Sequence, residues 1–385
     1  MSRKPRLVRI ATVPISLKLL LEGQPVFFQE QGFEVLTVSA AGPEVRDLET
    51  TGVPHRIIPF TRRITPWQDL VCLVQLVRVL WTFRPDIVHT HTPKAGLLGM
   101  LAAWLTRVPA RLHTVAGLPL MEATGITHFI LQTTEAITYA CATNVYSNSR
   151  GLLHFISQHF PRHGHKFQML GNGSTNGIDL MRFTATTALQ AQAKWLREQL
   201  GISARAMVIG FIGRLVGDKG IHELVRTFLL SKWPDTHLVL VGPFEDERDP
   251  VDAEVKREIL HHPRIHSVGF QADVRPWLLT FDLFAFPSYR EGFPNVVMQA
   301  ACLGVPCVVS DINGCNELVQ PGHSGWLVPP KDARALGAAL AEALARPDLR
   351  AEFARTLRQF VADHYDRRVI WVALLKEYSR VLTFV

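Results

Sequence analysis

Short apolar runs alternate with longer helical patterns along almost the whole chain, and this alternation restricts the possible folds more than any other feature. Chains of this kind build parallel sheets with helices on both faces. Strand patterns in the first half fall at 7–13, 34–38, 55–60, 86–91, 111–115, 144–147 and 166–170. In the second half they fall at 208–212, 237–241, 265–268, 283–286, 307–310 and 325–328. The sequence therefore predicts an α/β protein with doubly wound, Rossmann-like sheets.

The domain organisation follows from chain length and from one turn-rich connector. Helical patterns fall at 17–31, 66–83, 96–106, 127–142, 188–200, 333–345, 349–364 and 367–381. A chain of 385 residues is long for one core, and a segment rich in Gly, Ser and Asn at 171–177 separates the two strand series. We expect two Rossmann-like domains, 1–175 and 176–365, and a final segment, 366–385, that crosses back to the first domain. Ligands of such folds bind at the carboxyl ends of the strands, which predicts an inter-domain cleft.

Composition narrows the class of protein. Hydrophobic residues make up 47% and charged residues 19%, as in a globular enzyme rather than a disordered chain. No apolar h-region follows the basic N-terminus and no run is long enough to span a bilayer, so we expect a cytoplasmic protein. The five cysteines show no C-x-x-C spacing, which favours structural thiols over disulfides or zinc ligands.

The net positive charge is confined to the first half. Residues 1–175 carry 17 Lys and Arg against 10 Asp and Glu, whereas residues 176–385 carry 24 of each. Such asymmetry indicates an anionic partner, either a membrane surface, a pyrophosphate-bearing acceptor or nucleic acid, unless the basic surface is merely solvated. Aromatic and basic residues are not interleaved as on a nucleic-acid-binding face, so we expect no nucleic acid.

Two loops of the second domain have the pattern of an anion site. At 287–303 a strand pattern leads through a Gly/Pro-marked loop into a helix, which directs backbone N–H groups at an anion. The residues of this predicted phosphate seat are Gly292, Phe293, Pro294, Asn295 and Val296. Glu291 stands just before the seat, where its carboxylate can accept hydrogen bonds from hydroxyls.

The second loop follows another strand, which ends at Gly213. Arg214 and Lys219 project from this loop, and two cations can bind a diphosphate. Surface charges flanking a turn are the alternative. We favour the anion site because both loops lie at strand ends of one domain and suit one ligand.

The first domain carries polar residues at its strand ends. His89 and His91 fall on one side of a strand, but no third ligand is placed by spacing, so no metal is expected. His91 and Lys94 are interpreted as hydrogen-bond and charge donors at the cleft mouth, with a structural role as the alternative. Ser16, in the loop after the first strand, and Ala116 and Gly117, after a later strand, are further candidate acceptor or cleft residues of this domain. The loop that contains Ser16 lacks G-x-G-x-x-G, and this argues against a dehydrogenase.

Four segments together resemble the family 4 retaining glycosyltransferases of GT-B fold. They are the His-Thr-His-Thr-Pro-Lys-Ala-Gly-Leu-Leu-Gly run at 89–99, the connector at 171–179, the loop at 213–220 and the stretch from Glu291 to Gln299. The last is similar to the Glu-x7-Glu motif of that family. The resemblance covers nearly the whole chain and is closest to bacterial enzymes that extend undecaprenyl-diphosphate-linked sugars in capsule, O-antigen or protein-glycan assembly.

The resemblance implies a reaction and a set of ligands. It implies transfer of an N-acetylhexosamine or related amino sugar, with retention, from a UDP-linked donor to a lipid-linked saccharide. It implies no metal or other cofactor. The enzyme would act at the anionic inner face of the plasma membrane as a peripheral protein.

The same resemblance implies roles for individual residues. Glu291 would hold hydroxyls of the donor sugar, and Arg214, Lys219 and the N–H groups of 293–296 would stabilise the departing diphosphate. Phe270 would lie where the family holds the nucleotide base.

Two residues depart from the family pattern. Ala116 and Gly117 stand where relatives show His-Gly, and Gln299 replaces the Glu that grips the ribose. An uncharged acceptor gives up about 1 kcal/mol per bond, so we expect weaker donor binding rather than loss of function. A catalytically impaired GT-B scaffold and a UDP-sugar 2-epimerase are the alternatives.

Overall fold

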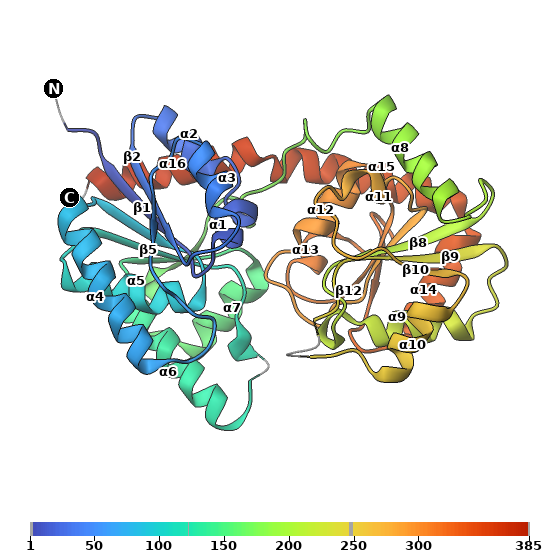
Figure 1. Ribbon diagram of the computed structural model, residues 1–385, viewed down its shortest axis with the longest axis horizontal. Coiled ribbons are helices and arrows are strands. Elements are labelled where there is room, and N and C mark those ends of the chain that lie inside the picture. Colours follow the sequence, from blue (N-terminus) through green and yellow to red (C-terminus); the bar gives the residue numbers. More distant parts are fainter. Residues whose placement is uncertain (1–2, 122, 246–248, 384–385) are drawn as a thin grey trace. The chain divides into compact units, whose positions relative to one another are not determined.

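The chain forms two compact α/β units, each with its own parallel sheet (Figure 1). The computed structural model describes residues 3–121, 123–245 and 249–383. The first unit comprises Met1–Gly177 together with Arg367–Val385, and the second comprises Ile178–Asp366. The first unit is therefore assembled from two separate parts of the chain.

The first unit contains a seven-stranded sheet in the order β3-β2-β1-β4-β5-β6-β7. Its strands, all parallel, are β1 (Arg6–Ile10), β2 (Glu34–Ser39), β3 (His55–Ile57), β4 (Ile87–Thr90), β5 (Ala110–Val115), β6 (Asn144–Ser147) and β7 (Phe167–Met169). All seven match predicted strand patterns. β1 and β3 end earlier than expected because Pro14 begins a helix and Pro59 has no N–H to donate to the sheet.

Helices cover both faces of this sheet. They are α1 (Pro14–Leu20), α2 (Gln24–Glu30), α3 (Val45–Thr50), α4 (Pro66–Phe83), α5 (Pro93–Leu105), α6 (Gly125–Cys141), α7 (Arg150–His159) and α16 (Arg367–Thr383). The α4–α6 layer packs on one face, where Val8 and Ile10 point, and α2 and α16 pack on the other, where Leu7 points (Figure 1). This burial on both faces explains why the strands read as continuous apolar runs.

The prediction of a single helix at 17–31 is wrong. The chain breaks into α1 and α2 because Gly23 adopts φ 76°, a left-handed conformation that favours glycine. A Cβ at Gly23 would also lie 2.8 Å from the ring of Trp371 on α16.

The second unit contains a six-stranded parallel sheet in the order β10-β9-β8-β11-β12-β13. Its strands are β8 (Met207–Ile212), β9 (Thr236–Val241), β10 (Ile265–Ser267), β11 (Leu283–Phe286), β12 (Cys307–Ser310) and β13 (Trp326–Val328), and all six match predicted patterns. Its helices are α8 (Thr187–Gln199), α9 (Ile221–Leu230), α10 (Ala253–His261), α11 (Arg275–Leu278), α12 (Asn295–Cys302), α13 (Cys315–Leu318), α14 (Ala333–Ala345) and α15 (Pro347–Tyr365). They again form layers on both faces (Figure 1).

The strand order reverses once in each sheet. The reversal lies between β1 and β4 in the first unit and between β8 and β11 in the second. Loops leaving the carboxyl ends of these neighbouring strands diverge to opposite faces, and ligands of doubly wound folds bind at that point. The same loops carry most of the residues singled out from the sequence.

Two further expectations concern thiols and membranes. All five cysteines are buried as free thiols, as their spacing predicted. None of the helices in the described ranges has the length and apolarity needed to span a membrane.

Candidate functional site

The loops that follow β8 and β11 meet at the reversal point of the second sheet. Gly220, with φ 69°, leads into α9, and a Cβ there would lie 2.1 Å from the carbonyl oxygen of Pro287. Only glycine permits this approach. The backbone N–H of Tyr289 donates to the carbonyl of Asp218 at 2.8 Å and ties the two loops together.

An ion pair joins the predicted residues of these two loops. Lys219 Nζ lies 2.5 Å from Glu291 Oε1, and their side chains are only 14% and 18% exposed. Ser288 Oγ donates to the same carboxylate oxygen at 3.1 Å. Among the residues the structure describes, both partners of Glu291 therefore use Oε1. Burying a charge with so little solvation costs free energy unless the charge is paired. Each of the two side chains therefore needs the other in this position.

Arg214 is the more accessible of the two predicted cations. Its side chain is 43% exposed, and Nη1 donates to Glu245 Oε2 at 2.7 Å. The sequence analysis did not single out Glu245, although it lies just beyond the carboxyl end of β9, the strand next to β8. The order of strands in the sheet, which the sequence pattern does not give, is what makes Glu245 a neighbour of Arg214.

The predicted phosphate seat lies at the start of α12. Pro294 is the N-cap residue and no side chain caps the helix there, so the first N–H groups of α12 are uncapped donors. Phe293 is buried against Tyr365, with ring centroids 5.0 Å apart. Gly314 supports the seat from behind, because a Cβ there would lie 2.8 Å from Phe293 Cα. The loop at 310–317 therefore buttresses the site.

Three other seat residues lie in the loop and in the first turn of α12, and their role toward a ligand stays a prediction. Gly292 is buried within the loop, whereas Asn295 and Val296, in the first turn of α12, are half-buried. Gln299 lies one turn further along the same helix and is also half-buried.

A buried thiol lies beside the ion pair. Cys315 begins α13 and is fully buried. Burial, with a further contribution from the negative charge of Glu291, raises the pKa of the Cys315 thiol well above its usual value. The thiol is therefore protonated at neutral pH and is a weak nucleophile.

Phe270 follows β10 at the same sheet edge. Its side chain is 69% exposed. The N–H of Gly242, after β9, donates to the carbonyl of Gly269 at 2.8 Å, and the N–H of Gly213 donates to Val241 at 2.9 Å. The loops after β8, β9 and β10 are thus neighbours, and Phe270 stays a predicted base contact.

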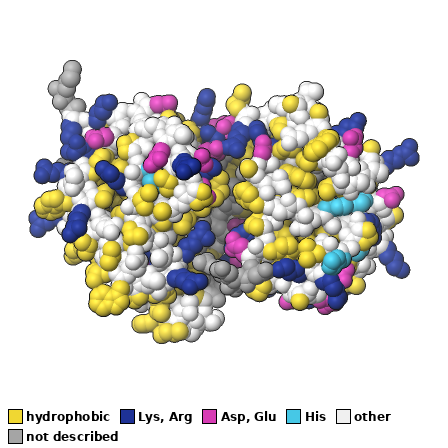
Figure 2. All heavy atoms as spheres, in the orientation of Figure 1, with side chains coloured by type: hydrophobic (Ala, Val, Ile, Leu, Met, Phe, Trp, Pro, Cys, Tyr) yellow, Lys and Arg dark blue, Asp and Glu magenta, His cyan; other side chains and the backbone are white. Residues whose placement is uncertain are grey.

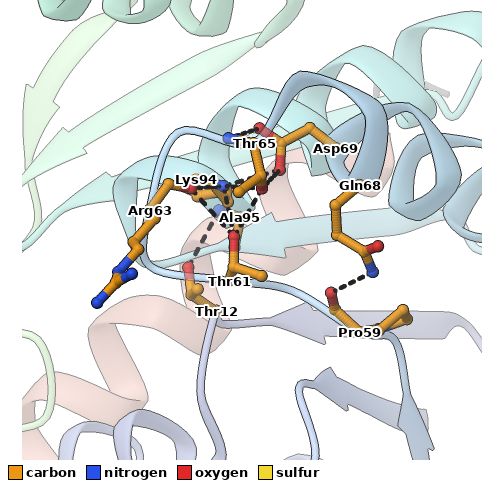
Figure 3. A network of polar contacts seen from close by, with 9 residues as sticks. All are labelled: Thr12, Pro59, Thr61, Arg63, Thr65, Gln68, Asp69, Lys94 and Ala95. Carbon is orange, nitrogen blue, oxygen red and sulfur yellow. Dashed lines mark hydrogen bonds and ion pairs between the residues drawn. The ribbon is translucent and has the colours of Figure 1, made fainter.

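In the first unit Lys94 is held by a polar network (Figure 3). Its Nζ lies 2.7 Å from Asp69 Oδ1 and 3.0 Å from Thr61 Oγ1, and it also donates to the carbonyl of Arg63. The side chain is only 14% exposed. These contacts fit the structural alternative better than a free charge at a cleft mouth.

His91 belongs to a buried network that the sequence analysis missed. Its Nε2 accepts a hydrogen bond from Arg9 Nε at 3.0 Å, and Arg9 Nη2 donates to Gln24 Oε1 at 2.6 Å. Arg9 is fully buried, and no carboxylate among the described residues pairs with it. Burial lowers the pKa of His89 and His91 well below the usual value and that of His113 to about 4, so all three are neutral at neutral pH.

The remaining predicted residues of the first unit lie on neighbouring segments. Ser16 is half-buried in α1, which follows β1. Ala116 and Gly117 follow β5 and are half-buried, and the carbonyl of Ala116 accepts from Asn148 Nδ2 at 3.1 Å. Their roles toward an acceptor stay predictions. In the described part of the chain, no group of three or more His, Cys, Asp or Glu side chains is placed to hold a metal ion.

Two Rossmann-like units, each with its own parallel sheet, are the architecture of the GT-B class of protein. Residues 28–173 match the model of the glycosyl transferase 4-like domain, and residues 206–346 match that of the glycosyl transferases group 1. A capsular polysaccharide biosynthesis glycosyltransferase of Staphylococcus aureus, CapM, is 30% identical over 99% of this chain and 98% of its own. The chain therefore belongs to the family 4, group 1 glycosyltransferases, and the resemblance noted in the sequence is confirmed.

Other relatives agree with this membership. The Escherichia coli UDP-Gal:alpha-D-GlcNAc-diphosphoundecaprenol alpha-1,3-galactosyltransferase is 28% identical over 84% of this chain and 85% of its own. The Campylobacter jejuni N,N'-diacetylbacillosaminyl-diphospho-undecaprenol alpha-1,3-N-acetylgalactosaminyltransferase is 25% identical over 91% and 92%. Anabaena HepE, solved with UDP and glucose, superposes with a TM-score of 0.83 at 21% identity over 98% of this chain and 100% of its own. That superposition confirms the GT-B fold.

Proposed function

We propose that this glycosyltransferase moves an N-acetylhexosamine or related amino sugar from a UDP-linked donor to a lipid-linked saccharide, with retention of anomeric configuration. Support for the acceptor comes from the E. coli and C. jejuni relatives, whose names specify undecaprenol diphosphate-linked acceptors. The donor sugars of these two relatives differ, and the amino sugar is the choice that the sequence resemblance favoured.

The observation that carries the proposal is the Lys219–Glu291 pair beside the uncapped start of α12. When the bond between the anomeric carbon and the phosphate oxygen breaks, negative charge grows on the diphosphate and positive charge on the sugar. Lys219, Arg214 and the N–H groups of α12 supply positive potential for the diphosphate. Because this potential replaces that of a divalent cation, we propose a metal-independent reaction.

Glu291 has the complementary task. Its carboxylate would accept hydrogen bonds from donor-sugar hydroxyls and stabilise the developing positive charge of the ring. Cys315, protonated beside it, is unsuited to attack the sugar. For retention we propose that the acceptor hydroxyl attacks from the face that the diphosphate leaves, and that a phosphate oxygen takes its proton.

The charge of the first unit favours an acidic acceptor on an anionic membrane. The first unit carries 21 Lys and Arg against 11 Asp and Glu, whereas the second carries 20 against 23. A lipid-linked diphosphate and the anionic inner face of a plasma membrane both match this basic surface. We therefore propose that the enzyme is peripheral to that membrane.

The test is calorimetric titration with UDP and then with UDP-N-acetylhexosamines in EDTA. We expect metal-independent binding that weakens at least about tenfold in Arg214→Ala, because a charge-assisted contact contributes about 1.5–3 kcal/mol. Arg205→Ala, an exposed arginine of the same unit, is the matched control and should bind like the parent. If UDP and the other nucleotides all fail to bind the parent, the catalytic proposal is wrong and the scaffold alternative takes its place. Product formed from the donor alone would instead indicate an epimerase.

A further inference from the structure

The outward side of α4 is apolar, although it faces solvent. Trp67, Leu70, Val74 and Trp81 are exposed by 84%, 51%, 45% and 67%. They recur every three, four or seven residues and so form one stripe along the helix. The opposite side, which includes Leu76, is buried in the core. A helix on the surface of a soluble domain ordinarily places polar residues on its outward side, so α4 requires another explanation.

The apolar surface continues across the neighbouring helices. α5 packs against both α4 and α6, so the three helices form one layer. On α6, Ile126 and Phe129 are 73% and 64% exposed, and Trp104 near the end of α5 is 54% exposed. We call the outward residues Trp67, Leu70, Val74, Trp81, Ile126 and Phe129 the helical face.

Charged residues are nearly absent from this layer. The three helices contain only Asp69, Arg78, Lys94 and Glu135. Asp69 and Lys94 pair with each other, and Glu135 is buried. Of these four charged residues, Arg78 is the one whose side chain is exposed and outside the Asp69–Lys94 pair. An exposed apolar area of this extent marks an interaction site.

Basic residues stand at both ends of the layer. Arg62 and Arg63 precede α4 and are exposed. At the other end a pocket of about 420 Å³ is lined by Trp81, Arg84 and Arg107, among others. Figure 2 shows hydrophobic side chains gathered over α4 and α6, with a few Lys and Arg side chains nearby. An apolar surface with a basic rim is complementary to the headgroups and acyl chains of an anionic bilayer.

We propose that the helical face docks the first unit on an anionic lipid bilayer, with Trp67, Trp81 and Phe129 entering the boundary between headgroups and acyl chains. The inference rests on the proposed function, because it assumes a lipid-linked acceptor. It goes further by identifying the surface that contacts the lipid. Aromatic side chains are suited to that boundary, and the arginines at both ends supply the attraction to anionic lipid. The basic rim favours a bilayer over a second copy of the chain, whose identical rim would repel it.

The experiment measures binding to vesicles of phosphatidylglycerol and phosphatidylcholine by flotation. The variant is Trp67→Glu/Trp81→Glu, and the matched control is Trp195→Glu, a tryptophan 54% exposed on α8 of the second unit. We expect the variant to bind vesicles at least about tenfold more weakly than the parent, because each substitution removes a large apolar contact and adds a negative charge. The control should bind like the parent, and phosphatidylcholine alone or high salt should weaken binding of both.

Two results would overturn the inference. One is a double variant that binds phosphatidylglycerol vesicles as tightly as the parent. The other is a parent that forms dimers in sedimentation, a variant that is monomeric, and no difference in vesicle binding, since the helical face would then join two copies. Thermal unfolding of the variant, compared with the parent, verifies that the first unit is intact.

Failure of the proposed function would be visible separately. Vesicle binding requires no turnover, and UDP titration reports only on the second unit. Loss of UDP binding together with face-dependent vesicle binding would reject the glycosyltransfer proposal and keep the docking surface. If both stand, the variant should lose turnover at least about tenfold on acceptor embedded in vesicles and retain it on a short-chain, water-soluble acceptor.

Discussion

Replacing Glu291 by Gln keeps the shape of the side chain and removes its charge, so it separates nucleotide binding from sugar transfer. In the parent, Lys219 Nζ is held 2.5 Å from this carboxylate in a poorly solvated position. A hydrogen bond to a charged group contributes about 1.5–3 kcal/mol and a neutral one about 0.5–1.5. In Glu291→Gln the partner of Lys219 is neutral, so the interaction of Lys219 with a diphosphate should be stronger by about 1 kcal/mol. This corresponds to roughly fivefold tighter UDP binding.

The effect on the sugar should be opposite. If Glu291 holds donor-sugar hydroxyls, the additional affinity of UDP-sugar over UDP should shrink in Glu291→Gln. Turnover should fall about 100-fold or more, because a stabilising charge is absent when the ring becomes cationic.

Calorimetry with UDP and a UDP-sugar, together with a turnover assay, measures these changes. Glu254→Gln, an exposed carboxylate on α10, is the matched control and should resemble the parent. In a Lys219→Ala background the Gln substitution should give no gain in UDP affinity, since the cation it releases is missing. UDP binding that weakens tenfold in Glu291→Gln would refute the reasoning, because the carboxylate would then be holding the nucleotide or positioning Lys219 for it.

Two other outcomes are expected. Ala116→His should raise turnover by roughly tenfold if the enzyme is merely impaired by lacking the family's histidine, whereas an inert scaffold would show no product with either residue. The buried histidines His89, His91 and His113 have pKa values lowered by burial, that of His113 to about 4, so the unfolded chain takes up protons below about pH 6.5 that the folded chain does not. The free energy of unfolding should fall from pH 6.5 toward 4 by up to about 1.4 kcal/mol per pH unit for each histidine. Burial raises the pKa of Glu135 to about 7, so between about pH 4.5 and 7 the folded chain holds a proton there that the unfolded chain releases. This one proton partly offsets the fall in the free energy of unfolding. Urea unfolding at pH 7 and pH 5 measures the slope, and a His113→Gln variant with an undiminished slope would contradict the assignment.

The central strands were predictable because they are buried on both faces. β4, β6, β11 and β12 lie within two residues of their predicted limits, since parallel strands read as uninterrupted apolar runs bounded by turns. The break between α1 and α2 was not predictable in the same way. It depends on Trp371, which is remote in sequence and packs where Gly23 has no side chain.

The candidate site was likewise predictable only in part. Glu291 and Lys219 could be predicted to lie close together, because both follow strands of one parallel sheet. The partners of the other charged residues could not be predicted. Glu245 becomes a neighbour of Arg214, and Asp69 a neighbour of Lys94, only through tertiary packing.

Arg9 shows the limit most clearly. In the sequence it is one of several basic residues near the N-terminus, yet β1 carries it into the interior among histidines and an amide. Neither charge nor hydropathy distinguishes it from its exposed neighbours.

The placement of α16 has a consequence for how the protein is made. This helix is synthesised after the entire second unit, yet Tyr378 Oη lies 2.7 Å from His89 Nδ1 and Leu374 is buried among strands of the first unit. On the ribosome the second unit, a continuous segment, can close its core while the part of the first sheet that α16 covers is still exposed. The nascent chain must shield that part of the sheet until α16 emerges, so proteolytic trimming of the helix would damage a unit whose other residues are all intact.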